Sequence, residues 1–161
     1  WATVNAFKNT SGITTAELDA VASAFLVREG ARSAPMIEVG YPAATCISVN
    51  DEAAHGLPGR RVLTPGDLVT LDVAVELGGY YADAAVTVGV PPVAPAHQRL
   101  CACAEAALQA AIQAARSGRP LRQIGRAAEG LARQRGYRVV RALHGHRIGR
   151  RHDRAERDRR P

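Results

Sequence analysis

A glycine pair between two runs of alternating apolar residues most constrains how this chain can fold. Gly78-Gly79 can form a two-residue turn that reverses the chain, and the runs on either side repeat with the period of two that is typical of β-strands. The pattern therefore predicts a β-hairpin in which Asp72 lies opposite Ala85. One hairpin face then carries the apolar side chains of Leu71, Val73, Val75, Val86 and Val88.

Two carboxylates lie on the other face of this predicted hairpin. Asp72 is on the first strand, and Asp83 on the second is its diagonal neighbour on the same face. Two close carboxylates repel each other, whereas one divalent metal, or two metals about 3.5 to 4 Å apart, would make their proximity favourable. The alternative is a solvated sheet face that carries an acid at each end, and the spacing alone does not decide between the two.

Further helices and strands are predicted on both sides of the hairpin. Thr14 and Glu17 have the spacing of a capping box, which indicates a helix over residues 15–29. Its predicted buried stripe is Leu18, Val21, Ala22, Phe25 and Leu26. Other predicted elements are a strand at 46–49, a helix at 97–116, a helix from Pro120 to Gly136 and a strand at 137–143. The 97–116 helix is expected to bury Leu100, Ala104, Leu108, Ala111, Ile112 and Ala115, and the next helix Leu121, Ile124, Ala128 and Leu131.

Composition limits the protein classes that remain. The 161 residues suit one domain, and no apolar run is long enough to span a bilayer, so a membrane protein is excluded. Residues 1–115 carry 6 basic and 11 acidic side chains, but residues 116–161 carry 15 basic and 4 acidic ones. The three cysteines suggest no disulfide framework and favour a reducing compartment.

Two histidines extend the list of candidate site residues. His55 is on a loop before the hairpin, and His146 follows the last predicted strand. Imidazole and carboxylate ligands together suit zinc, manganese, iron or cobalt, so His146 with Asp72 and Asp83 makes a chemically sensible partial metal site. Alternatively, His55 is an ordinary surface residue and His146 belongs to a basic tail.

Four sequence segments, in order and with matching spacing, resemble the type I methionine aminopeptidases. They are GYPAATCISVNDEAAHGLPG at 40–59, LTPGDLVTLDV at 63–73, GGYYAD at 78–83 and GHRIGR at 145–150, with GITTAELD at 12–19 as a helix opening. The resemblance covers about residues 12–151. It implies an α+β pita-bread fold, a curved antiparallel sheet backed by helices, incomplete at the C-terminus.

The resemblance also assigns roles to individual residues. Asp72 and Asp83 would be metal ligands, the second bridging two metals, and His146 would be the imidazole ligand. His55 would bind substrate and stabilise the tetrahedral intermediate, while Cys46 and Tyr41 would line the methionine pocket. The implied cofactors are divalent ions (Co, Mn, Fe or Zn), nominally two per site. The implied substrates are the N-terminal Met-peptides of nascent proteins, with the ribosome as a further candidate partner, in the cytoplasm.

The chain departs from the family pattern near its end. The motif at 145–149 has Arg147 where the family has glycine, and two glutamate ligands of the family do not occur before Pro161. We therefore expect a partial catalytic domain over 1–151, an Arg-rich solvated tail over 152–161, and weak or absent activity, as from a frameshift or truncation.

The alternative is a catalytically dead binding protein whose Arg-rich C-terminus contacts RNA, the ribosome or an acidic partner. Nucleic-acid binding is disfavoured because no aromatic residues are interleaved with the arginines, and a proline-specific relative is disfavoured by the CISVN and HGLP segments.

Overall fold

The computed structural model describes residues 12–143, 145–146 and 148–150, which form two units. In the described part of the chain, the first unit consists of residues 12–93 together with 146 and 148–150, and the second of residues 94–143 and 145. The predicted tail at 152–161 lies outside the described residues. No described helix combines the length and apolar character needed to cross a membrane.

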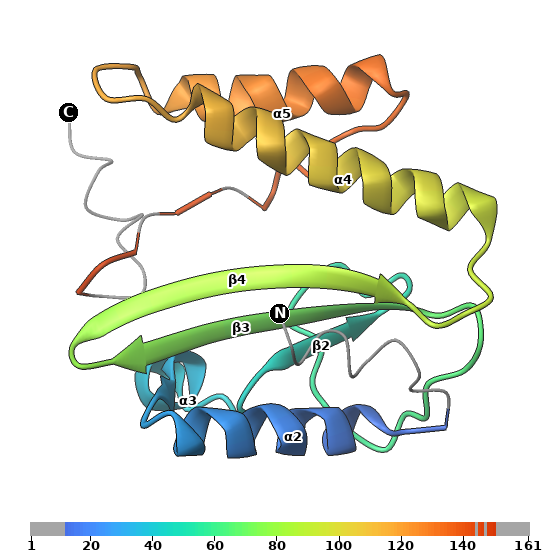
Figure 1. Cartoon of the computed structure of the whole chain (residues 1–161), viewed down its shortest axis with the longest axis vertical. Coiled ribbons are helices and arrows are strands. Elements are labelled where there is room, and N and C mark those ends of the chain that lie inside the picture. Colours follow the sequence, from blue (N-terminus) through green and yellow to red (C-terminus); the bar gives the residue numbers. More distant parts are fainter. Residues whose placement is uncertain (1–11, 144, 147, 151–161) are drawn as a thin grey trace. The chain divides into compact units, whose positions relative to one another are not determined.

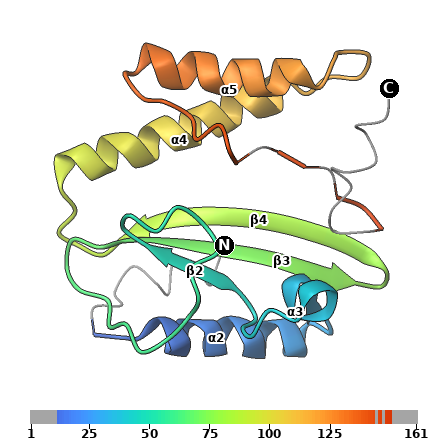
Figure 2. The same ribbon diagram turned by 180° about the vertical axis from the view of Figure 1, so that it is seen from behind.

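An antiparallel sheet forms the centre of the first unit. The hairpin strands β3 (Leu68–Leu77) and β4 (Tyr80–Gly89) pair along their whole length and make a long curved ribbon (Figure 1). On its other edge β3 pairs with β1 (Arg32–Ser33) and β2 (Cys46–Val49), and Figure 2 shows β2 beside it. The predicted hairpin, its register and the 46–49 strand are all confirmed, including Asp72 opposite Ala85.

Helix α2 (Thr15–Arg28) runs along the sheet and begins with the predicted capping box. The Thr14 backbone N–H donates to Glu17 Oε2 at 2.7 Å, and the Glu17 N–H donates to Thr14 Oγ1 at 3.2 Å. This reciprocal pair satisfies backbone donors that the first helical turn leaves without helical partners. The prediction of the helix start is therefore confirmed down to the hydrogen bonds.

The predicted buried stripe of α2 is only partly correct. Leu18, Ala22 and Leu26 are buried, but Val21 is 48% exposed and Phe25 is 41% exposed. The apolar face of the helix is wider than the surface that covers it. Phe25 instead borders a cavity of about 430 Å³ between α2 and the apolar face of the hairpin.

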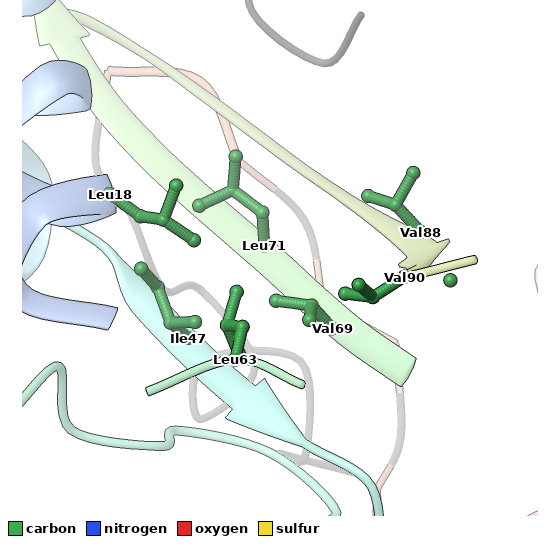
Figure 3. Close-up of a pocket in the computed structure, with 8 residues that line it drawn as sticks. Leu18, Ile47, Leu63, Val69, Leu71, Val88 and Val90 are labelled. Atoms are coloured by element: carbon green, nitrogen blue, oxygen red, sulfur yellow. The ribbon is translucent and has the colours of Figure 1, made fainter. Parts of the chain in front are cut away.

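The core of the first unit lies on the sheet face opposite the two carboxylates. Leu18 from α2 points toward Ile47 of β2 and Leu71 of β3 in Figure 3. The space left between these side chains is only about 10 Å³, so the core is closely packed. The buried cluster consists of Leu18, Ile47, Val49, Leu63, Val69, Leu71 and Val90.

The second unit contains two helices, α4 (Pro95–Ala114) and α5 (Arg122–Gln134). The helices are where the sequence predicts them, but the stripe predicted for α4 is wrong. Leu100, Leu108 and Ile112 are 43%, 55% and 52% exposed. The helix meets α5 through a face rich in alanine, because small alanine side chains permit a closer approach than leucines do. Near this face Arg135 Nη1 donates to the Ala102 carbonyl at 3.0 Å.

Two more expectations for this unit are not met. Leu121, expected inside, is 62% exposed. Residues 137–143, expected as a strand, have no strand structure. Among the described residues they pair with no strand, and an extended segment needs such pairing to satisfy its backbone donors and acceptors.

Candidate metal and substrate site

The carboxylate-bearing face of the hairpin is the foundation of the candidate site. Asp72 is paired with Ala85 of β4 on one side and with Cys46 of β2 on the other, so one row crosses three strands. Asp83, two positions from Ala85, projects from the same face. This face is not simply solvated, since Asp72 and Asp83 are half-buried and Glu76 farther along β3 is buried.

His146 reaches this face although it is far away in the sequence. Its Nε2 atom lies 3.4 Å from Asp83 Oδ2. Nearby, the Tyr81 N–H donates to the Gly149 carbonyl at 2.7 Å. Arg150 lies over the Tyr80 ring, 5.3 Å from its centroid, and donates to its hydroxyl at 3.2 Å. Three contacts at the turn end of β4 thus bring the imidazole to the carboxylate.

The loop that carries His55 is fastened to β2. The Ile47 N–H donates to the Gly56 carbonyl at 2.8 Å, and the Gly56 N–H donates to Ser48 Oγ at 3.0 Å. A Cβ atom on residue 56 would lie 2.3 Å from the Ile47 carbonyl oxygen, so the loop can approach this closely only with glycine there. His55 itself is exposed and has a left-handed backbone with φ of 57°.

Tyr41 and Cys46 lie between this loop and the carboxylates. The Tyr41 hydroxyl donates to the Gly56 carbonyl at 3.1 Å and interacts with the Cys46 thiol. Burial raises the pKa of Cys46, and the negative charges of Asp72, Asp83 and Asp19 raise it further, although the Tyr41 hydrogen bond opposes them. Burial is also the main cause of the raised pKa of Tyr41. Both groups therefore stay neutral at physiological pH.

The structure brings together most of the site residues expected from the sequence. Asp83 and His146 are in contact, Asp72 pairs with Cys46 across the strands, and Tyr41 contacts the backbone at His55 and Cys46. The donor set of two carboxylates and one imidazole suits a divalent transition metal. Among the described residues, no three His, Cys, Asp or Glu side chains are gathered closely enough to hold a metal ion together.

Asp19 is a site neighbour that the sequence reasoning did not single out. Its carboxylate accepts hydrogen bonds from the loop directly before Cys46. A signal was present, because Asp19 follows the buried Thr15 by four residues and precedes the buried Ala22 by three. A carboxylate beside the buried stripe of a helix usually has a specific polar partner.

Comparisons with known proteins agree on one family. The profile of metallopeptidase family M24 matches residues 2–159. Methionine aminopeptidase 2 of Bacillus subtilis is 44% identical over 140 residues, which are 86% of this chain and 56% of that protein. The chain therefore spans little more than half the length of this relative.

Solved structures show the same relationship. The crystal structure of methionine aminopeptidase from Rickettsia prowazekii superposes with a TM-score of 0.89 at 33% identity, covering 95% of this chain and 63% of that one. The corresponding enzyme from Thermotoga maritima gives 0.88 at 28% identity, covering 93% and 61%. These similarities confirm the predicted α+β pita-bread fold.

Proposed function

The chain belongs to metallopeptidase family M24, and we propose that its site binds a divalent metal and the N-terminal methionine of a peptide, as part of a methionine aminopeptidase centre. The observation that carries this proposal is the 3.4 Å contact between His146 Nε2 and Asp83 Oδ2, on the face that also bears Asp72. The relatives named methionine aminopeptidase supply the substrate class.

Asp72, Asp83 and His146 would hold the metal after drawing closer together than they lie in the described structure, and the metal could be cobalt, manganese, iron or zinc. When bound, such a metal supplies an activated water and a Lewis acid for amide hydrolysis. The 3.4 Å contact already brings Asp83 Oδ2 and His146 Nε2 close together, so that less ordering of these two donors is needed when a metal binds. Two carboxylates and one imidazole are few donors for two ions, so we expect a single bound metal and slow turnover.

Tyr41 and Cys46 would form the wall of the pocket that receives the methionine side chain. Both groups are neutral at physiological pH, and Cys46 is only 7% exposed, so together they offer a polarisable surface suited to a thioether. His55, on the loop fastened by Gly56, is proposed to hydrogen-bond the peptide near its reacting carbonyl. A reducing cytoplasm is the proposed location, because all three cysteines are free thiols.

Titration calorimetry with Mn²⁺ tests the metal-binding part. We expect saturable binding by the native chain and an affinity about tenfold or more lower in Asp83→Asn and His146→Ala. His97→Ala and Glu105→Gln, on exposed positions of α4, serve as matched controls that keep native affinity. Absence of saturable binding, or native affinity in both site variants, would refute the proposed centre.

Hydrolysis of a Met-Ala-Ser peptide, followed by mass spectrometry, tests the reaction itself. The expected result is slow release of methionine that depends on added Mn²⁺ and is lost in Asp83→Asn. Equal release without metal, or equal release from a peptide with an N-terminal Lys, would contradict the proposed activity and specificity.

A further inference from the structure

The carboxylate of Asp19 links α2 to the loop that leads into the site. Its Oδ1 atom accepts hydrogen bonds from the Thr45 N–H at 2.8 Å and from Thr45 Oγ1 at 2.7 Å. Its Oδ2 atom accepts a third from the Ala44 N–H at 3.3 Å. One side chain thus binds three donors on two successive residues.

The loop in question has no regular structure of its own. Residues 41–45 lie between the short helix α3 (Ala34–Val39) and β2, and Ala43, Ala44 and Thr45 are all buried. Buried backbone N–H groups need partners, and a loop segment does not find them in a helix or a sheet ladder. Asp19 supplies these partners, and charge-assisted hydrogen bonds are stronger than neutral ones.

The two ends of this loop carry the proposed pocket wall. Tyr41 begins it, and Cys46 follows Thr45 directly and pairs with Asp72. Tyr41 is held on its other side by the Gly56 carbonyl, and Cys46 by the β2–β3 ladder. Between these two points, the hydrogen bonds from Ala44 and Thr45 to Asp19 connect the loop to α2.

We propose that Asp19 is a positioning residue that sets the separation and orientation of Tyr41 and Cys46, and thereby the shape of the methionine-binding wall. It acts through the loop and does not touch the substrate. The assignment of the wall to methionine rests on the proposed function, whereas the ordering of the loop by Asp19 does not.

The rate at which iodoacetamide alkylates Cys46, read peptide by peptide with mass spectrometry, measures this order in the intact chain. Asp19→Ala is expected to raise the rate about tenfold, because all three acceptor contacts are lost and the buried thiol becomes accessible. Asp19→Asn should give a smaller increase, since it removes the negative charge that helps to raise the pKa of Cys46 but keeps an amide oxygen that can accept from Thr45. Cys101, on α4, provides the reference rate within the same molecule.

Glu17→Ala is the matched control. Glu17 is on the same helical turn, and its carboxylate accepts from the Thr14 N–H and hydroxyl, so its loss weakens the start of α2 without touching the loop. We expect a native Cys46 rate in this variant. Equal rates in Asp19→Ala and Glu17→Ala would overturn the proposal, because the effect would then be general helix destabilisation.

Protection by free L-methionine distinguishes the proposed methionine pocket from the proposed positioning role of Asp19. It should protect Cys46 from alkylation in the native chain and in Glu17→Ala, but not in Asp19→Ala. If methionine fails to protect native Cys46 while Asp19→Ala still accelerates alkylation, the proposed methionine pocket is wrong and the positioning role stands. If Asp19→Ala does not fold, amide hydrogen exchange of Ala44 in Asp19→Asn decides, because the side-chain NH2 group that replaces Oδ2 cannot accept the Ala44 N–H, and native protection of Ala44 would overturn the proposal.

Discussion

At the scale of single residues, Gly56 shows how the absence of a side chain allows the loop that carries His55 to lie against β2. Replacing it with alanine places a Cβ atom 2.3 Å from the Ile47 carbonyl oxygen, which is backbone and cannot rotate away. We expect Gly56→Ala to lower the free energy of unfolding by about 2 to 3 kcal/mol, as measured by urea denaturation.

Gly125 offers the matched control for this substitution. It lies inside α5, and a Cβ there would meet nothing within 4 Å. Gly125→Ala should therefore stabilise the chain by about 0.5 to 1 kcal/mol, because alanine is the better helix former. Similar effects of the two substitutions would show that the contact at Gly56 is not what limits that position.

Glu76 makes stability depend on pH. Its carboxylate accepts from the Gly79 N–H at 2.7 Å and pairs with Arg32 at 2.7 Å, and these contacts hold its pKa below the ordinary 4.5. A carboxyl group whose pKa is lowered by folding stabilises the folded state above its unfolded pKa. That contribution is lost as the pH falls through the folded pKa.

Thermal unfolding of the native chain and Glu76→Gln checks this linkage. We expect the native chain to have the higher melting temperature at neutral pH, and the difference to shrink as the pH falls below 4.5. A difference that stays constant with pH would mean that the Glu76 charge does not contribute. Arg28→Gln, which breaks the exposed pair with Glu29, should change little at any pH.

Some of the candidate site residues could be predicted from local sequence patterns and others could not. The common face of Asp72 and Asp83 follows from strand alternation and a two-residue turn, both of which are local rules. The roles of Tyr41, Cys46 and His55 follow only from the resemblance, because nothing local joins them to the hairpin. Ligand chemistry suggests His146 as a metal ligand, and the resemblance supports that role. Asp19 was missed since its partners lie 25 and 26 residues away.

At the scale of elements, the hairpin turn end holds the segment that brings His146 to the site. Tyr80 contacts Arg150 of this segment in two ways, since its ring lies under the guanidinium and its hydroxyl accepts a hydrogen bond from it. We expect Tyr80→Ala to weaken Mn²⁺ binding about threefold to tenfold by titration calorimetry, because a cation–π contact and a hydrogen bond are lost without removing a ligand.

Tyr80→Phe refines that prediction by keeping the ring and removing only the hydroxyl. It should retain most of the affinity, and Tyr137→Ala in the second unit should retain all of it. Native affinity in Tyr80→Ala would mean that the Gly149 hydrogen bond to the β4 backbone suffices to place His146.

Local signals predicted most of the helices and strands, with the short helix α3 as an exception, and prediction failed where a strand needed a partner. The capping box marked α2, but the short helix α3 was overlooked despite Ser33 as N-cap, Pro35 in its first turn and a left-handed Gly40. Residues 137–143 have strand-like composition and yet form no strand, because pairing is a tertiary property.

At the scale of the whole molecule, large apolar side chains remain exposed on both units. Phe25 and Val21 are exposed on α2, while Leu108 and Ile112 are exposed one turn apart on α4. Surfaces of this kind promote association. We expect the sedimentation coefficient to rise with protein concentration in analytical ultracentrifugation.

The double variant Leu108→Lys/Ile112→Lys should reduce this concentration dependence. Gln113→Lys, on the same helix, adds a charge without removing apolar surface and should leave it unchanged. A sedimentation coefficient that is independent of concentration in the native chain would contradict the expectation.

The division of the first unit into two pieces of sequence has a consequence for how the site is assembled. Asp72 and Asp83 leave the ribosome early, on a hairpin that needs only neighbouring residues to form. His146 emerges only after residues 94–145 have been synthesised, and its arrival closes a long chain loop at an entropic cost. A metal bound by Asp72, Asp83 and His146 would link the hairpin, which is synthesised early, to the segment that carries His146, which is synthesised late. If the proposed metal site is correct, the newly made protein would bind the metal only after residues 146 and 148–150 have docked on the hairpin.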